Sequence, residues 1–202
     1  MNYNHISRLF TLLIMVALTL VACKDPNTME EEEEEQTNNN PYGITFEEIA
    51  DFPVGESTTV NGNIDDGIVL PDLDWADLSN VACFPGTRFI EFQGKQEFYT
   101  VNIPQGSELI VTVTPTGSKE RINLYGYIDF NGNNLPPLTS VLSCEAGYEL
   151  YVGNPDLTQP GEPQSISFAQ AVNKGFTCFV AVSGAKDVEA GEYSLEFRLE
   201  PY

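Results

Sequence analysis

Residues 192–200 read Glu-Tyr-Ser-Leu-Glu-Phe-Arg-Leu-Glu, and apolar and polar side chains alternate along the whole stretch. Successive side chains of a β-strand point to opposite faces of the sheet, so this order gives one apolar face and one wetted face. The stretch therefore predicts a half-buried antiparallel strand that covers a hydrophobic core. Because no segment of about eleven residues shows a convincing helical period, we expect the folded part to be all β.

The same alternation, bounded by Gly, Pro, Asn and Asp, recurs in shorter segments upstream. Residues 176–183 are nearly all apolar, which is typical of a central strand buried on both faces. The expected strands are 57–61, 88–92, 97–103, 109–113, 122–130, 148–152, 165–172, 176–183 and 192–200. About seven to nine short antiparallel strands at this spacing predict a single β-sandwich.

Length and charge exclude several classes of function. The 202 residues suit one domain, and a net charge of -21 argues against nucleic acid, whose binding depends on Lys and Arg that neutralise phosphates. His5 is the only histidine and lies in a segment that we expect to be removed, so a Ser-His triad and a His-ligated metal are excluded. We therefore expect no enzyme. The weaker alternative is a glycoside hydrolase that uses two carboxylates, although no acidic pair stands out.

Residues 1–22 have the parts of an export signal. Arg8 supplies positive charge, and Leu9 to Val21 form an apolar run that is too short to span a membrane comfortably. The next motif, Leu20-Val21-Ala22-Cys23, resembles the lipobox of bacterial lipoproteins. That resemblance implies that Cys23 is lipidated and that the protein is anchored to a membrane without spanning it. The alternative is an ordinary secretory signal with an incidental cysteine.

Residues 23–41 contain six consecutive glutamates, Glu30 to Glu35, and no apolar periodicity. Adjacent like charges repel one another and bury nothing, so this linker is expected to be disordered. An acidic run behind a lipidated cysteine resembles the export signal of Bacteroidota surface lipoproteins. The resemblance implies an outer-membrane protein that faces the exterior. A solvated spacer on the periplasmic face is the alternative.

The order of features in the remaining domain, residues 42–202, resembles the bacterial pre-peptidase C-terminal domain. The motifs are Thr59-Val60-Asn61-Gly62, the strand and Pro-Gln-Gly turn of 97–109, the strand and Asn-Gly turn of 122–133, the apolar strand 176–184, and Ala-Gly-Glu-Tyr-Ser-Leu at 190–195. The resemblance implies a jelly-roll-like β-sandwich with a non-catalytic accessory role. Residues 65–85 and 144–163 are longer connections than that family usually has.

Three cysteines remain after Cys23. Cys178 is in step with the apolar side chains of its strand and is expected to be a buried free thiol. Cys83 and Cys144 lie in or near loops and are the expected disulfide in an oxidising compartment. The alternative is three unpaired thiols.

Oxygen-bearing side chains alternate at Asp129, Asn131 and Asn133, as they do in calcium-binding loops. A turn at the end of a strand explains the same residues, since Asp and Asn favour turns. A second acidic group surrounds Trp75 and is either a solvated loop, a calcium site or a binding loop. It consists of Asp65, Asp66, Asp72, Asp74 and Asp77. Calcium is the only cofactor that the sequence leaves open.

Four aromatic residues are candidates for stacking on the sugar rings of a glycan: Trp75, Tyr125, Tyr127 and Tyr151. The three tyrosines are out of step with the apolar side chains of their strands, so they face away from the predicted core. The alternative is that they pack in a second layer of the sandwich.

Together these features predict a lipid-anchored, non-catalytic module of the cell envelope that binds an extracellular polymer, either a glycan or a protein. A structural or accessory subunit of an outer-membrane assembly, with no small ligand, is the alternative.

Overall fold

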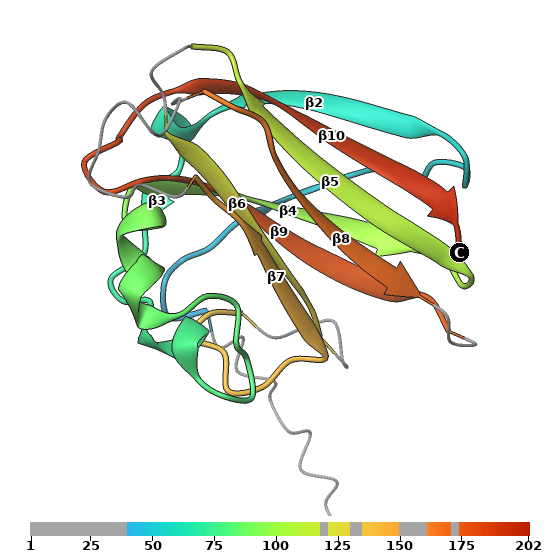
Figure 1. Cartoon of the computed structure of the whole chain (residues 1–202), viewed down its shortest axis with the longest axis horizontal. Helices are drawn as coiled ribbons and strands as arrows, with labels where there is room; N and C mark the ends of the chain where they lie inside the picture. Colours follow the sequence, from blue (N-terminus) through green and yellow to red (C-terminus); the bar gives the residue numbers. More distant parts are fainter. Residues whose placement is uncertain (1–39, 118–120, 130–134, 150–160, 171–173) are drawn as a thin grey trace, which may run out of the picture. The chain divides into compact units, whose positions relative to one another are not determined.

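The structure is a computed structural model that describes residues 40–117, 121–129, 135–149, 161–170 and 174–202. All of them fall in one compact unit, Asn39–Tyr202. In chain order the elements are β1 (Phe46–Glu48), β2 (Ser57–Asn63), η1 (Ile64–Asp66), β3 (Ile68–Val69), η2 (Asp74–Asp77), η3 (Gly86–Glu91), β4 (Lys95–Ile103), β5 (Ser107–Pro115), β6 (Ile122–Ile128), β7 (Ser143–Gly147), β8 (Gln164–Gln170), β9 (Phe176–Gly184) and β10 (Glu192–Pro201) (Figure 1).

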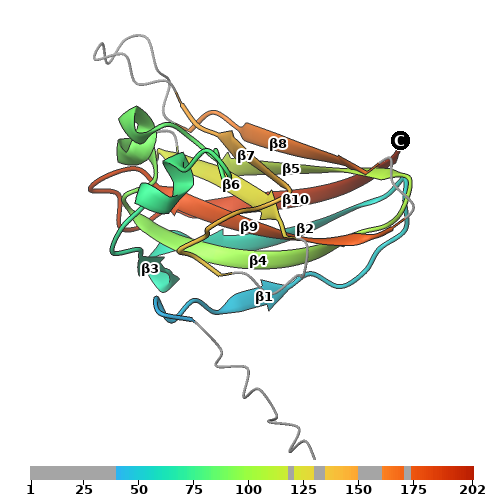
Figure 2. The ribbon, with the colours of Figure 1, turned by 90° about the horizontal axis from the view of Figure 1, so that it is seen from below.

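The strands form two sheets that pack face to face (Figure 2). The first sheet has the order β1-β4-β9-β6-β7, with β3 paired to the same edge of β4 as β1, and the second has the order β2-β10-β5-β8. When the short β1 and β3 are left out, the remaining eight strands can be renumbered from 1 to 8 in chain order. In that numbering the two sheets have the strand orders 2-7-4-5 and 1-8-3-6, which is the topology of a jelly roll.

The predicted all-β, jelly-roll-like sandwich is therefore confirmed. The described residues hold ten strands instead of the predicted seven to nine, because β1 and β3 are too short to give an alternating pattern. The prediction that every strand is antiparallel is wrong for β1, which pairs with β4 in parallel through Phe46 and Phe98.

The core between the two sheets follows from the alternation along the strands. In β10, every second side chain faces inward and is buried: Tyr193, Leu195, Phe197 and Leu199. The register sets β10 between β2 and β5, so these side chains meet those of β4 and β9 from the opposite sheet.

A second core lies on the outer face of the first sheet. Cys178, Val180 and Val182 of β9 point to the first core, whereas Phe179 and Ala181 point to the second. The segment from Leu70 to Phe92, which includes η2 and η3, packs over this face (Figure 1). Strand β6 is consequently buried at every position.

The strand predicted at 88–92 is wrong. Residues 88–91 lie in η3 and Phe92 follows it, because Phe89 and Phe92 share a face at a spacing of three, which suits a 3-10 turn. Both rings contact Phe84. Of the strand predicted at 148–152, Tyr148 and Glu149 are not in a strand, and residues 150–152 lie outside the described residues. The strand just before them is β7, where Gly147 pairs with Leu124 of β6.

Cys83 and Cys144 form a disulfide, the pairing that the sequence analysis expected. It joins the segment between η2 and η3 to the edge strand β7, so it fastens the outer layer to the first sheet. Cys178 is a free, fully buried thiol, and burial raises its pKa. No helix among the described residues is long and apolar enough to cross a membrane.

Loss of the disulfide should destabilise the domain. We expect the double variant Cys83→Ser, Cys144→Ser to lower the free energy of unfolding by about 2–5 kcal/mol, because the bond closes a long loop of the unfolded chain. Urea titration followed by circular dichroism measures this, with Cys178→Ala as the control that keeps the bond. An unchanged unfolding midpoint in the double variant would contradict the pairing.

Candidate functional site

The predicted sugar-stacking residues are buried. Trp75 is 3% exposed, and Tyr125 and Tyr127 lie with it in the outer core. The Trp75 and Tyr125 rings are 6.0 Å apart, and the Tyr125 hydroxyl donates to Gln96 Oε1 at 2.8 Å. The prediction of an exposed platform is wrong for these three residues because the outer face of their sheet is covered. Tyr151 lies outside the described residues.

The calcium prediction is only partly within the described residues. Asp129 is buried, while Asn131 and Asn133 lie outside them. The described residues contain no group of three or more His, Cys, Asp or Glu that could hold a metal ion.

In the acidic group around Trp75, two carboxylates have structural partners. Asp72 accepts from the Asp74 amide at 2.6 Å, and Asp65 pairs with Lys95 at 2.8 Å. These contacts agree with the interpretation of a turn-rich, solvated loop.

A buried charged cluster, which sequence reasoning missed, consists of Glu91, Arg121, Asn123 and Glu149. The Glu91 carboxylate, 1% exposed, pairs with Arg121. Asn123 links the two acids, since its Nδ2 donates to the Glu91 carbonyl at 2.7 Å and its Oδ1 accepts from the Glu149 amide at 3.1 Å. Glu149 Oε1 in turn accepts from the Gly161 amide at 3.1 Å.

Burial raises the pKa of both carboxyl groups in this charged cluster. Arg121 and Arg88 oppose that effect at Glu91. At Glu149, backbone donors from Glu162 and Gly161, together with Arg121, lower the pKa, and the charge of Glu91 raises it. One oxygen of each acid, Glu91 Oε1 and Glu149 Oε2, is buried without a hydrogen-bond partner.

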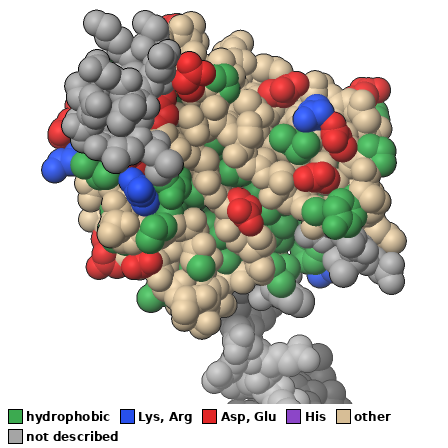
Figure 3. Space-filling model, in the orientation of Figure 1, with side chains coloured by type: hydrophobic (Ala, Val, Ile, Leu, Met, Phe, Trp, Pro, Cys, Tyr) green, Lys and Arg blue, Asp and Glu red, His purple; other side chains and the backbone are tan. Residues whose placement is uncertain are grey.

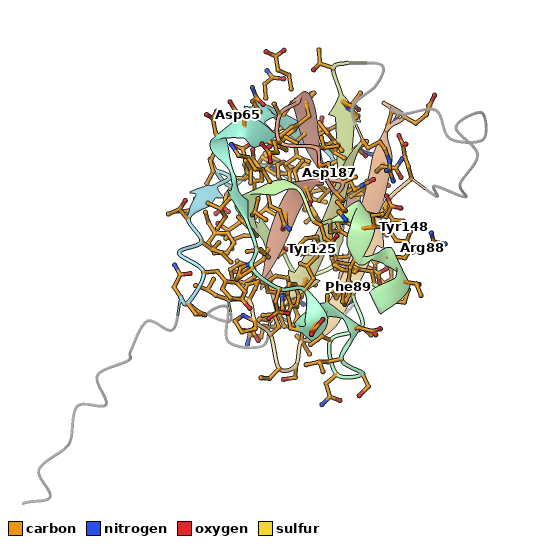
Figure 4. All side chains as sticks on the ribbon, turned by 90° about the vertical axis from the view of Figure 1, so that its left-hand side faces the viewer. Asp65, Arg88, Phe89, Tyr125, Tyr148 and Asp187 are labelled. Atoms are coloured by element: carbon orange, nitrogen blue, oxygen red, sulfur yellow. A yellow bond between two sulfur atoms is a disulfide. The ribbon has the colours of Figure 1, made fainter. Side chains whose placement is uncertain are left out.

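Raised carboxyl pKa values are typical of general acids, but a catalytic group also needs access to a substrate. Neither Glu91 nor Glu149 is among the residues that line the cavities of about 280, 230 and 380 Å³ in the described part of the chain. The one signal in the sequence was a carboxylate inside the apolar stretch Phe89-Ile90-Glu91-Phe92. Next to this acid, the guanidinium of Arg88 lies over the Tyr148 ring at 5.8 Å (Figure 4).

The second sheet differs from the first because no described element covers its outer face. Most of its outward side chains are short and uncharged, and none is buried. They are Ser57, Thr59, Asn61, Glu108, Ile110, Thr112, Thr114, Ser165, Ser167, Ala169, Ser194, Glu196, Arg198 and Glu200. On the side of the molecule in Figure 3, charged and hydrophobic side chains are scattered over a surface made mostly of backbone and other side chains. Those outward residues define the open face of the second sheet, which is accessible to a partner.

Burial of Trp75 gives a direct optical prediction, since it is the only tryptophan. Acrylamide should quench its fluorescence weakly in the folded protein and several-fold more strongly after unfolding in urea. We expect Trp75→Ala to cost about 3–5 kcal/mol of stability, as is usual for truncating a buried aromatic side chain. Tyr202→Ala, at a residue that is 67% exposed, is the neutral control. Ready quenching of the folded protein would contradict the packing.

Glu149→Gln should stabilise the domain in a pH-dependent way. The raised pKa of Glu149 means that its carboxyl group binds a proton more tightly in the folded state than in the unfolded state. Protonation of Glu149 therefore stabilises the fold fully at pH values below the ordinary glutamate pKa. This stabilisation is lost as the pH rises through the raised pKa. The amide retains the acceptor for Gly161 and removes a buried charge beside Glu91.

We expect the variant to match the parent near about pH 4 and to be more stable by roughly 1–2 kcal/mol near about pH 7.5, the scale of an unsatisfied buried polar group. Urea titrations at both pH values test this, with the exposed Glu145→Gln as control. An equal difference at both pH values would refute the role of the charge.

No protein-family model matches the sequence, and no curated protein matches it. Among solved structures, the fold is similar to that of PliG, a periplasmic inhibitor of g-type lysozyme from Aeromonas hydrophila. The superposition covers 78% of this chain and 97% of the PliG chain. The identity is 10% and the TM-score 0.42, and a likeness of that size carries no conclusion about what this chain binds.

Proposed function

We propose that this chain is a lipid-anchored, non-catalytic module that binds a protein partner at the outer surface of a bacterial cell. The open face of the second sheet carries this proposal. The outer face of the first sheet is covered by the chain's own segment from Leu70 to Phe92. The outer face of the second sheet is accessible, so it is the face available for binding a partner.

The cell envelope is supported by two independent features. The Cys83–Cys144 disulfide suits an oxidising compartment, since such bonds are rare in a reducing cytosol. The lipobox-like motif ending at Cys23 and the glutamate run behind it supply the proposed anchor and the proposed outward orientation. The resemblance to the pre-peptidase C-terminal domain adds a non-catalytic, accessory role to the proposal.

A protein partner is favoured over a glycan by the burial of the aromatic side chains. Stacking on sugar rings needs an exposed ring, and Trp75, Tyr125 and Tyr127 are all packed in the outer core. The open face instead offers hydroxyl and amide groups on a flat sheet, which suit hydrogen bonding across a protein interface. Another subunit of an outer-membrane assembly is one kind of protein partner that fits this proposal.

Photo-crosslinking in the bacterium that makes the protein tests this function. Benzoyl-phenylalanine in place of Thr114 puts a reactive group on the open face, and the same residue in place of Ser79 puts it on the covering segment. We expect a discrete protein adduct from the first position and none from the second. No protein adduct from Thr114, or equal adducts from both positions, would contradict the proposal.

A further inference from the structure

Strand β2 is an open edge of the second sheet. It lies at the end of the strand order, and among the described residues only β10 pairs with it. Gly55 and Glu56 both bond to Leu199, through the Gly55 amide and the Glu56 carbonyl, and the Ile64 amide donates to the Gly191 carbonyl. From Glu56 onward, the backbone groups of even-numbered residues therefore face β10. Because backbone groups alternate along a strand, those of Ser57, Thr59 and Asn61 face outward.

Between Ser57 and Asn63, this edge lacks the charges and prolines with which soluble proteins protect edge strands, and no described segment covers it. Such strands are usually very short or carry charges, prolines or bulges, or else another segment covers them. Strand β2 reads Ser-Thr-Thr-Val-Asn-Gly-Asn, seven residues with neither a charge nor a proline. In the first sheet, by contrast, the free edge of β4 is protected, because β1 and β3 pair with it. A partner strand can therefore pair with β2 without displacing any described element.

A carboxylate lies directly beneath β2. A Cβ atom at Gly62 would come within 2.6 Å of Glu97 Oε2, so the absence of a side chain at Gly62 makes room for this acid. The hydroxyl groups of Tyr193 and Tyr99 both donate to the same oxygen, the latter at 3.2 Å. Glu97 of β4 thus bonds to Tyr193 of β10 and links the two sheets beneath Gly62 of β2.

Glu97 also lines a cavity of about 280 Å³ at the edge of β4, between β1 and β3. Two further acidic residues, Glu47 and Asp66, line the same cavity, and no Lys or Arg lines it. The nearby Lys95 pairs with Asp65. The cavity therefore attracts a positively charged side chain, and the overall charge of -21 favours the approach of a basic partner.

We propose that the partner protein adds an extended segment to β2 as a new edge strand, and that this segment places a Lys or Arg side chain in the cavity lined by Glu47, Asp66 and Glu97. The inference rests on the proposed function and specifies its partner. Main-chain hydrogen bonds give the affinity in this mode of recognition, and the side-chain pocket gives the specificity.

Charge disfavours a second copy of this chain as the added strand. An antiparallel pair of β2 strands centred on Val60 would place Asp65 of one copy opposite Gly55 of the other, one residue from Glu56, at both ends of the ladder. Like charges at those positions repel, whereas a basic segment would be attracted at the same places.

The test uses the full chain in the bacterium that makes it, with benzoyl-phenylalanine in place of Asn61 on β2. Thr59→Pro removes an amide on the free edge and leaves the pairing with β10 intact, since proline is tolerated on edge strands. Thr59→Val keeps the amide and is the matched control. We expect Thr59→Pro to abolish the Asn61 adduct and Thr59→Val to keep it. Thermal unfolding verifies that each variant folds, and Ser57→Pro replaces Thr59→Pro if that variant does not.

The charged part is tested by the double variant Glu47→Gln, Asp66→Asn against the control Glu145→Gln, Glu162→Gln, which removes equal charge elsewhere. We expect the first to weaken the adduct about threefold or more and the second to leave it unchanged. Mass spectrometry of the adduct should identify a segment that contains Lys or Arg.

Several results would overturn the inference: an adduct insensitive to Thr59→Pro, loss in Thr59→Val as well, an equal effect of the two charge variants, or an adduct between two copies of this chain. If Thr114 yields a protein adduct and Asn61 yields none, the inference fails and the proposed function stands. If neither position yields a protein adduct, both fail.

Discussion

The packing of both faces of the first sheet determines the rest of the architecture. Strand β9 sends Val180 and Val182 into the core between the sheets and Phe179 and Ala181 into the outer core. A sheet with two apolar faces needs a cover on the outside, because an uncovered face would expose a large apolar patch to water. The segment from Leu70 to Phe92 is that cover, and the bond between Cys83 and Cys144 fastens it to β7. The second sheet has one apolar face and needs no cover, which is why no described element packs on its outer face.

The alternation along single strands could be predicted from the sequence, and the layers above them could not. Strand β10 follows its pattern residue by residue, and the apolar run of β9 correctly indicated burial on both faces. For Tyr125 and Tyr127 the same pattern was misleading. It placed them on the face away from the main core, and a period of two says nothing about what covers that face. The long connection at 65–85 was recognised, but its role as a cover depends on contacts that no local pattern contains.

The charged cluster of Glu91, Arg121, Asn123 and Glu149 illustrates the same limit for a site. These residues come from η3, the start of β6 and the segment after β7, so no spacing in the sequence brings them together. Buried acids are costly because they lose hydration. Arg121, Asn123 and the Gly161 amide offset part of that cost here. The charged cluster fixes the ends of several segments at one end of the sandwich, and this structural role explains two acids with raised pKa values without requiring catalysis.

The negative charge of the chain affects which strands can pair with β2. An unprotected edge strand is a hazard for any protein, since it invites pairing between copies. A net charge of -21 opposes that encounter, because two copies repel one another before their edges meet. The same charge favours the approach of a basic partner to β2, and the carboxylates of Glu47, Asp66 and Glu97 lie beside the edge where such a partner would arrive. Under the proposed mode of binding, the acidity of the domain opposes self-association at the uncharged edge of β2 and favours a basic segment there.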